Sequence, residues 1–468
     1  MTFIRTRIAI SLAACAFVLS GCEMMDAVGD MFNRTPTMSN LQGERIAVLP
    51  NEEAIAPDPA LQTTPVVLPA PYRTTDWTQP GGFSTNAPYH LDAPGPLRVV
   101  WEQATGKGSD SSSRLTAPPI IAGGKIYVLD AEARVLCYQE ADGRPLWSVR
   151  LAPVGQSSFL YTWSLGLFGS NRAIDPSKGF GGGLAFDDGK LFVTTGFGDI
   201  FALNPQNGRQ LWKINVQTPI VNAPVANGGR VFVSSADNHF VALAQSDGHQ
   251  LWEHRGITET AGILVATSAA VAGENIVVPY SSGEVFALRV QTGQQNWNDM
   301  LTSTGNKTAI SELDDIAGRP VIDRDMVFAI SHSGTMVALK LSTGDRVWER
   351  GVGGTQTPWA AGDWVYVLTV DGQVLCLSRK DGHVRWMHQM EQFGDPEDKE
   401  DPITWSGPVL VSDRLVMVSS HGYAVSLSPY DGHLLGRMEI PDGAYIPPIV
   451  ANGTLYVYTN DAELVALR

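Results

Sequence analysis

The sequence lacks most of the motifs that mark a catalytic or metal centre. It has four cysteines and nine histidines in 468 residues. It contains no Cys-x-x-Cys, no His-Glu-x-x-His, no EF-hand loop and no Gly-x-Ser-x-Gly. These absences remove the usual sequence evidence for zinc sites, calcium sites and serine hydrolases. We therefore expect no catalytic residues and no metal site.

Positive charge is also scarce. The chain has 33 Lys and Arg against 48 Asp and Glu, a formal net charge of −15 at pH 7. Nucleic-acid binding draws much of its affinity from basic side chains that neutralise phosphates. An acidic chain of this kind is not expected to bind nucleic acid.

The N-terminal apolar run is too short to cross a membrane. Residues 8–19 fall short of the roughly 20 residues that a spanning helix needs. Two arginines precede the run, and Leu19-Ser20-Gly21-Cys22 follows it, which resembles the bacterial lipobox. We interpret residues 1–21 as a lipoprotein signal peptide and Cys22 as the acylated, palmitate-bearing residue. The alternative is a plain secretory signal with a chance cysteine.

Residues 22–95 have little periodicity and are rich in Pro, Thr, Asn and Ala. This composition is typical of an extended tether. Trp77 lies in its later part, and an aromatic side chain there indicates that this part docks on another surface. Glu23 follows the lipidated cysteine where the enteric sorting rule places an Asp in inner-membrane lipoproteins, which favours the outer membrane.

From residue 96 the sequence repeats itself. In each unit a small residue and a Leu close one strand, a turn ending in Gly follows, and a Trp comes four residues later, as in Ala202-Leu203, Asn207-Gly208 and Trp212. Asn-Gly and Asp-Gly favour type I′ hairpins, in which both central residues have positive φ, so we predict such turns here. Two further strands precede each turn. The unit is a four-stranded antiparallel meander of the kind found in propeller blades.

The outer-strand positions give the number of blades. Seven positions carry Trp, and the eighth carries Gly436 instead. The C-terminal residues 448–467 supply only three strands, while residues 97–102 supply an outer strand with no blade before it. Joining the two closes the ring and removes the free edge. The sequence therefore predicts an all-β, eight-bladed β-propeller over residues 96–468. The seven tryptophans are Trp101, Trp147, Trp212, Trp252, Trp297, Trp348 and Trp386.

The repeated Trp and the two later cysteines have structural interpretations. A Trp at a fixed place in every blade packs between neighbouring sheets, so we do not interpret these residues as ligand platforms. Cys137 and Cys376 occupy a position that is small in the other repeats, and we expect both to fill buried strand positions as free thiols.

The repeat resembles the pyrroloquinoline-quinone type of propeller repeat. Together with the lipobox and the closed ring of eight blades, it resembles the BamB lipoproteins of the β-barrel assembly machinery. The resemblance implies a non-catalytic scaffold without cofactors, anchored in the outer membrane with its propeller in the periplasm. It also implies binding to BamA and other assembly subunits, and contact with nascent outer-membrane proteins is a further possibility.

Two loops carry a more local resemblance. Residues 308–316 resemble the family's acidic inter-blade loop that contacts BamA, and the preceding loop, residues 262–266, aligns with its other contact loop. Val265 departs from the enteric pattern, which has an Arg there. Ile263 and Leu264 form either an apolar docking tip or the buried start of a strand. The candidate BamA-binding residues are Ile263, Leu264, Val265, Glu312, Leu313, Asp314 and Asp315.

Two alternatives use the same fold. A quinoprotein dehydrogenase has the same repeat but pairs two adjacent cysteines against its quinone, and this chain has no such pair. A sugar-binding or hydrolytic propeller is the other. The acidic stretch at residues 395–401 is interpreted as a solvated loop, with a calcium site as its alternative.

Overall fold

The computed structural model describes residues 55–110, 113–152, 181–258, 267–302 and 315–468. Ile55–Arg468 form one compact unit. Within the described ranges, eight four-stranded antiparallel sheets are arranged around a common axis, confirming the predicted eight-bladed propeller. No helix in these ranges is long and apolar enough to cross a membrane.

Seven blades are formed by consecutive strands, and we number them 1 to 7 in chain order. Blades 1 to 4 are built from β2 (Ile120–Ala122), β3 (Lys125–Leu129), β4 (Arg134–Gln139) and β5 (Pro145–Arg150); β6 (Gly182–Asp187), β7 (Lys190–Thr195), β8 (Asp199–Leu203) and β9 (Gln210–Asn215); β10 (Val225–Asn227), β11 (Arg230–Ser234), β12 (His239–Ala244) and β13 (Gln250–Arg255); and β14 (Ala270–Ala272), β15 (Asn275–Pro279), β16 (Glu284–Arg289) and β17 (Gln295–Met300).

Blades 5 to 7 follow the same plan. They are built from β18 (Val321–Asp323), β19 (Met326–Ile330), β20 (Met336–Lys340) and β21 (Arg346–Arg350); β22 (Trp359–Ala361), β23 (Trp364–Leu368), β24 (Gln373–Ser378) and β25 (Val384–Gln389); and β28 (Trp405–Val411), β29 (Arg414–Ser419), β30 (Tyr423–Leu427) and β31 (Leu434–Glu439). A hairpin of β26 (Phe393–Asp395) and β27 (Glu400–Pro402) lies between blades 6 and 7, and a short 3-10 helix, η1 (Pro59–Leu61), precedes the propeller.

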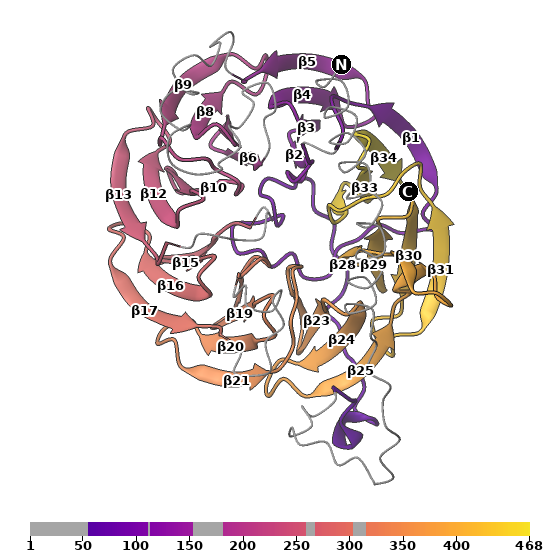
Figure 1. The fold of residues 1–468 in the computed structure, drawn as a ribbon. Helices are drawn as coiled ribbons and strands as arrows, with labels where there is room; N and C mark the ends of the chain where they lie inside the picture. The colour runs from indigo at the N-terminus through magenta and orange to yellow at the C-terminus, as the bar shows by residue number, and fades with distance from the viewer. Residues whose placement is uncertain (1–54, 111–112, 153–180, 259–266, 303–314) are drawn as a thin grey trace, which may run out of the picture. The chain divides into compact units, whose positions relative to one another are not determined.

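The eighth blade closes the ring as predicted. It combines β32 (Ile449–Ala451), β33 (Thr454–Tyr458) and β34 (Glu463–Leu467) with the N-terminal β1 (Val99–Ala104), and we call it the closing blade. β1 pairs antiparallel with β34. In Figure 1 the outermost strands follow the circumference and the first strands lie nearest the centre.

The turns between third and fourth strands differ from the prediction. Asn204 N–H donates to the Arg209 carbonyl at 2.8 Å and Gly208 N–H donates to the Asn204 carbonyl at 2.8 Å, so the loop has four residues. Only Gly208, with φ +67°, needs the left-handed conformation. The prediction of type I′ turns at this position was wrong, because a four-residue loop leaves Asn207 at negative φ. Consecutive positive φ values, as type I′ requires, occur instead between first and second strands, for example +59° and +80° at Gly228 and Gly229.

The repeated Trp packs against the next blade, as expected. The Trp212 indole N–H donates to the Gln245 carbonyl of blade 3 at 3.0 Å. A Cβ on Gly248, in that blade's last turn, would lie 2.8 Å from the Trp212 ring. The repeat therefore keeps Gly and Trp together because each Trp covers the Gly of the following blade. The pairs are Trp101–Gly143, Trp147–Gly208, Trp212–Gly248, Trp252–Gly293, Trp297–Gly344, Trp348–Gly382 and Trp386–Gly432.

This contact explains the irregular last repeat. Gly436 pairs with Ser426 where the other blades have Trp. The blade after it is the closing blade, whose third strand ends the chain and whose fourth strand comes from the N-terminus. That blade has no turn joining these strands, so a Trp at position 436 would have no turn glycine to cover.

The two cysteines of the propeller are buried and free. Cys137 pairs across the strands with Trp147, and Cys376 pairs with Trp386. In blade 2 the equivalent partner of Trp212 is the small residue Ala202. This confirms that each cysteine fills a small strand position.

Residues 55–95, assigned above to the tether, lie on the propeller. We call residues 74–93 the strap, because this segment crosses the centre of the ring and bonds to the first strand or first turn of every blade (Figure 1). Trp77, which was expected to dock, is 3% exposed and exchanges two 2.8 Å backbone hydrogen bonds with Ile121 of blade 1. Residues 22–54, which include Cys22 and Glu23, lie outside the described residues.

The strap meets the blades in ring order. It begins at the closing blade, where Asn452 N–H donates to the Thr74 carbonyl at 2.8 Å, and it ends at blade 7, where Leu91 N–H donates to Leu410 at 3.2 Å. First strands have no strand neighbour on their axial side, and the strap satisfies backbone groups there. The intermediate contacts join Trp77 to Ile121, Thr78 to Phe186, Gln79 to Ala226, Ser84 to Val271, Thr85 to Ile322 and Tyr89 to Trp359.

Candidate functional site

The strap fills one end of the propeller axis. The cavity beside it is lined by strap residues, including Trp77 and Asn86, and by first-strand residues of several blades. Its volume is about 40 Å³. Sites for small molecules and cofactors usually measure about 300–1,000 Å³, whereas a water molecule takes about 30 Å³. This end of the axis therefore does not fit a quinone.

The opposite face of the ring carries the connections between blades. Each blade is a meander that starts at the axis, and the strap lies at the turns between first and second strands. Because neighbouring strands are antiparallel, the opposite side of the ring carries the turns between second and third strands. It also carries the connections from each fourth strand to the next blade. We call this side the loop face and the strapped side the strap face.

In sequence, both predicted contact loops lie between strands whose described ends are at the loop face. One joins β13 to β14 and the other joins β17 to β18, so they flank the same blade, blade 4. The predicted contact residues Ile263, Leu264, Val265, Glu312, Leu313 and Asp314 lie outside the described residues. Asp315 is described, and it is 4% exposed. Its carbonyl accepts a 2.9 Å hydrogen bond from His332 N–H, so this residue forms part of the packed base of its loop.

The base of the first loop is held firmly and exposes an apolar residue. Ile257 N–H donates to the Glu284 carboxylate at 2.8 Å, and the Asn238 side-chain amide donates to the Ile257 carbonyl at 2.6 Å. The Ile257 side chain is nevertheless 53% exposed. Sequence reasoning missed Ile257, and the signal available was only its place directly after an outer strand. The first loop thus starts beside an exposed apolar residue on an ordered backbone.

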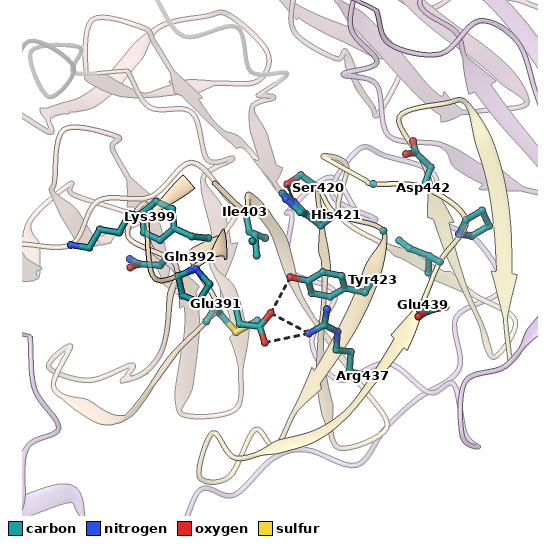
Figure 2. A pocket seen from close by; sticks show the side chains of 18 residues that line it. Glu391, Gln392, Lys399, Ile403, Ser420, His421, Tyr423, Arg437, Glu439 and Asp442 are labelled. Atoms are coloured by element: carbon teal, nitrogen blue, oxygen red, sulfur yellow. Dashed lines mark hydrogen bonds and ion pairs between the residues drawn. The ribbon is translucent and has the colours of Figure 1, made fainter. Parts of the chain in front are cut away.

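A groove of about 1100 Å³ opens on the same face between blades 6 and 7. One wall is the hairpin of β26 and β27, and the other is formed by the turn between β29 and β30 and the segment after β31. The His421 imidazole contacts the Asp401 carboxylate at 2.8 Å and ties the hairpin to blade 7. Figure 2 shows Lys399, Gln392 and Ile403 on the hairpin side and Ser420, His421 and Asp442 on the other.

The floor of the groove is a stacked polar cluster. The Arg437 guanidinium lies 3.6 Å from the centre of the Tyr423 ring and donates to both oxygens of Glu391 at 3.1 and 3.2 Å. The Tyr423 hydroxyl also donates to Glu391 at 3.2 Å (Figure 2). Burial, and then the adjacent Glu391 carboxylate, raises the pKa of Tyr423. The only floor cation is thus already neutralised by Glu391.

The stretch at residues 395–401, interpreted above as a solvated loop, is the exposed hairpin of this groove. Its carboxylates are exposed, as expected. The described side chains include no group of three His, Cys, Asp or Glu arranged to hold a metal ion. The histidines that follow the turn glycines, His249, His383 and His433, are exposed on the surface.

Comparisons with known proteins identify the family of the chain. The family model described as "Outer membrane protein assembly factor BamB" matches residues 98–162 and 161–388, more than half of the chain. Among curated proteins, the outer membrane protein assembly factor BamB of Salmonella typhimurium is 28% identical over 376 residues, covering 79% of this chain and 88% of the relative. The Escherichia coli protein of the same name is 27% identical over the same length.

Solved structures share the fold. BamB from Moraxella catarrhalis superposes with a TM-score of 0.63 at 18% identity, covering 80% of this chain and all of that one. A quinohemoprotein alcohol dehydrogenase from Comamonas testosteroni gives a TM-score of 0.62 at 13% identity, covering 85% and 81% of the two chains. At such low identity these similarities establish only the propeller fold, and function has to be argued from the residues of the site.

Proposed function

The chain belongs to the BamB family of outer membrane protein assembly factors, and from that premise we propose that it is a non-catalytic scaffold lipoprotein of the β-barrel assembly machinery. In this proposal it aids the folding and insertion of outer-membrane β-barrel proteins by holding assembly subunits together. The observation that carries the proposal is the contrast between the two faces. The strap fills the axis on one face, while on the other face the described residues expose Ile257 and leave an open groove between blades 6 and 7.

The proposed partner is BamA, bound through the two loops that flank blade 4. Ile263, Leu264 and Val265 supply apolar contact, and Glu312, Leu313 and Asp314 supply an acidic and apolar surface beside it. Ile257 extends the apolar side of this surface on ordered backbone. Interfaces of this kind place apolar residues centrally and charges at the rim. Because Asp315 is buried, we assign it the role of supporting the second loop rather than touching the partner.

The proposed location is the periplasmic side of the outer membrane. Acylation of Cys22 would anchor the chain, and more than one acyl chain is needed for stable anchoring. Residues 23–54 would then join the lipid to the segment that Asp58 and His383 hold against blade 6. The propeller would face the periplasm.

A quinoprotein dehydrogenase remains the alternative because such an enzyme has a similar fold. The strap argues against it. A quinone at the strapped end of the axis would have to displace residues that bond to all eight blades. The absence of a vicinal cysteine pair in the sequence points the same way.

A pull-down from native envelopes in mild detergent tests the proposal. Wild-type chain should bring down BamA, and Leu264→Glu and Asp314→Arg should each weaken the recovery. Asp315 is not chosen for charge reversal, because it is buried and its substitution would disturb folding. Glu274→Arg, at an exposed turn of blade 4 on the strap face, is the control and should bind normally. If wild-type chain recovers no assembly subunit, the proposed function is wrong.

A further inference from the structure

The chain joins the propeller on the strap face, at blade 6. Asp58 N–H donates to the Val384 carbonyl at 2.7 Å, and the Asp58 carboxylate contacts His383 in the turn between β24 and β25. The Arg385 guanidinium donates to the Thr64 carbonyl at 2.7 Å. Because neighbouring strands are antiparallel, this turn lies on the same side of the ring as the strap. Figure 1 shows the indigo segment beside β25.

Two stretches then form a layer over the strap face of blade 7. They are residues 65–73 and residues 88–96, and we call them together the cover; the second stretch includes the end of the strap. The buried His90 ring joins both stretches to the blade. Its Nε2 accepts a hydrogen bond from Asp413 N–H at 3.0 Å, so Nδ1 carries the proton and donates to the Pro69 carbonyl at 2.7 Å.

The cover also rests on the two blades beside blade 7. On blade 6, a Cβ on Gly362 in the first turn would lie 3.1 Å from the Val67 carbonyl oxygen. On the closing blade, the Arg73 guanidinium donates to the Asn452 carbonyl at 2.7 Å. The cover is therefore an ordered surface that spans three blades.

The outer side of the cover is apolar. Val67 is 69% exposed, and Tyr72 and Tyr89 are 38% and 37% exposed. Arg73 is the only charged residue among the exposed residues of the cover, and the others are Pro, Ala, Gly, Val and Tyr. Exposed apolar surfaces of this kind mark sites that meet another protein or a membrane.

The acidic groups at the edge of the cover already have partners. Asp363, in the first turn of blade 6, lies 3.6 Å from Arg324. Asp413, in the first turn of blade 7, accepts a hydrogen bond from the Tyr430 hydroxyl. The whole chain has a net charge of −15, whereas the exposed part of the cover carries one positive charge. An anionic lipid surface attracts basic groups, so it would not repel this part of the molecule.

The place where the chain enters favours a membrane as the occupant. The cover begins at Pro65, directly after the segment that the proposed lipid anchor would pull toward the bilayer. Docking of the cover on that bilayer is then an intramolecular event, for which a weak affinity is enough. Tyrosine side chains are enriched at the interface between membrane and water, and binding there grows with the apolar area.

We propose that the cover rests on the periplasmic surface of the outer membrane, with Val67 and Tyr72 at the level of the lipid headgroups. This inference rests on the proposed function, because it needs the acylated Cys22. The strap face would then be turned toward the bilayer. The loop face would point into the periplasm, where it is free to bind BamA.

Quenching by lipids tests this inference on the full-length, acylated chain in vesicles of phosphatidylethanolamine and phosphatidylglycerol. A fluorescent label is attached to Val67→Cys on the cover or to Val370→Cys on the loop face of the same blade. Val370 is 49% exposed in the turn between β23 and β24, so it is a matched control. The native Cys137 and Cys376 are buried and should stay unlabelled.

Lipids with a nitroxide near the headgroup quench labels that lie at the membrane surface. The label at position 67 should lose about half of its fluorescence, and the label at position 370 less than about a tenth. Ala70→Asp puts a negative charge on the cover and should lower the quenching at position 67 about twofold. Val370→Asp makes a comparable charge change on the loop face and should leave that quenching unchanged. Thermal unfolding checks that each variant remains folded.

Flotation of the vesicles separates this inference from the proposed function. Chain that does not float with the vesicles lacks the anchor, which overturns both. Chain that floats but is quenched as little at position 67 as at position 370 overturns this inference alone. The predicted difference between the two positions, lowered by Ala70→Asp and not by Val370→Asp, supports it.

Three other results would also overturn the inference. Equal, strong quenching at both positions would mean that the propeller has no preferred face. Unchanged quenching at position 67 in folded Ala70→Asp would mean that the label itself binds lipid. A label at position 67 that neither nitroxide lipid nor iodide in the water can quench would mean that a second copy, or the chain's own N-terminal residues, covers this face.

Discussion

The contact between each Trp and the glycine of the next blade makes a measurable prediction at Gly248. Gly248 has φ +79°, and a Cβ there would lie 2.8 Å from the Trp212 ring. Gly229 in the same blade has φ +80°, but a Cβ there would meet nothing within 4 Å. Replacing each with Ala therefore separates the backbone cost from the cost of the indole contact.

The magnitudes follow from these geometries. Placing Ala at positive φ costs about 1 kcal/mol at both positions. At Gly248 the methyl group also pushes into a packed indole, and overpacking of this kind costs about 1–3 kcal/mol more. We expect Gly229→Ala to lower the free energy of unfolding by about 1 kcal/mol, and Gly248→Ala to lower it by about 2–4 kcal/mol.

Urea unfolding of a soluble form beginning at residue 23 measures both changes, followed by fluorescence and far-UV circular dichroism. The double variant Trp212→Ala/Gly248→Ala completes the test. With the indole gone, Gly248→Ala should add only the backbone cost of about 1 kcal/mol, so the two substitutions should be non-additive. Equal losses for the two alanine variants, or strict additivity with Trp212→Ala, would refute the explanation of the repeat.

Three further predictions concern the strap, the thiols and the closing blade. Gln79→Ala should lower the free energy of unfolding by about 1–3 kcal/mol, because the buried Gln79 amide exchanges hydrogen bonds of 2.9 and 3.1 Å with the backbone of Ala226 and its loss leaves those backbone groups unpaired. Chemical denaturation measures this change, and Gln389→Ala, at an exposed side chain, is the control. Cys137 and Cys376 should resist a thiol reagent at pH 8 and react once urea unfolds the chain. The reason is that burial raises the pKa of both thiols, and it raises the pKa of Cys137 to about 12. Rapid reaction of the folded chain would contradict their burial. Gly436→Trp should change stability by less than about 0.5 kcal/mol, because the closing blade has no turn glycine for the indole to cover; a thermal shift comparable to that of Gly248→Ala would contradict this.

The propeller could be predicted because its packing is repetitive. Each blade needs the same small residue, turn glycine and Trp, so the spacing from Ala202 to Trp212 recurs along the chain. The sequence shows that Gly436 stands where the other repeats have Trp. Why no Trp is needed at this position became clear only from the structure of the closing blade. The turn type was predicted wrongly because Asn-Gly and Asp-Gly also fit a longer loop in which only Gly has positive φ.

The strap and the groove could not be predicted in the same way. Strap residues bond mainly through backbone groups to eight separate blades, and such contacts impose no sequence period. Trp77 was the one signal, and it correctly indicated docking. The hairpin at residues 395–401 was correctly interpreted as exposed. That it forms the wall of a groove depends on its contact with His421, which lies on a distant turn of the next blade.

The central claim is that the loop face binds BamA, and site-specific photo-crosslinking in the cells that make the chain tests it most directly. A photoreactive phenylalanine analogue would replace Ile257, which is exposed at the base of the first loop, or Glu274, which is exposed on the strap face of the neighbouring blade. We predict a crosslink to BamA from position 257 and none from position 274. A crosslink from position 274 alone, or none from either position in folded, membrane-bound chain, would contradict the account.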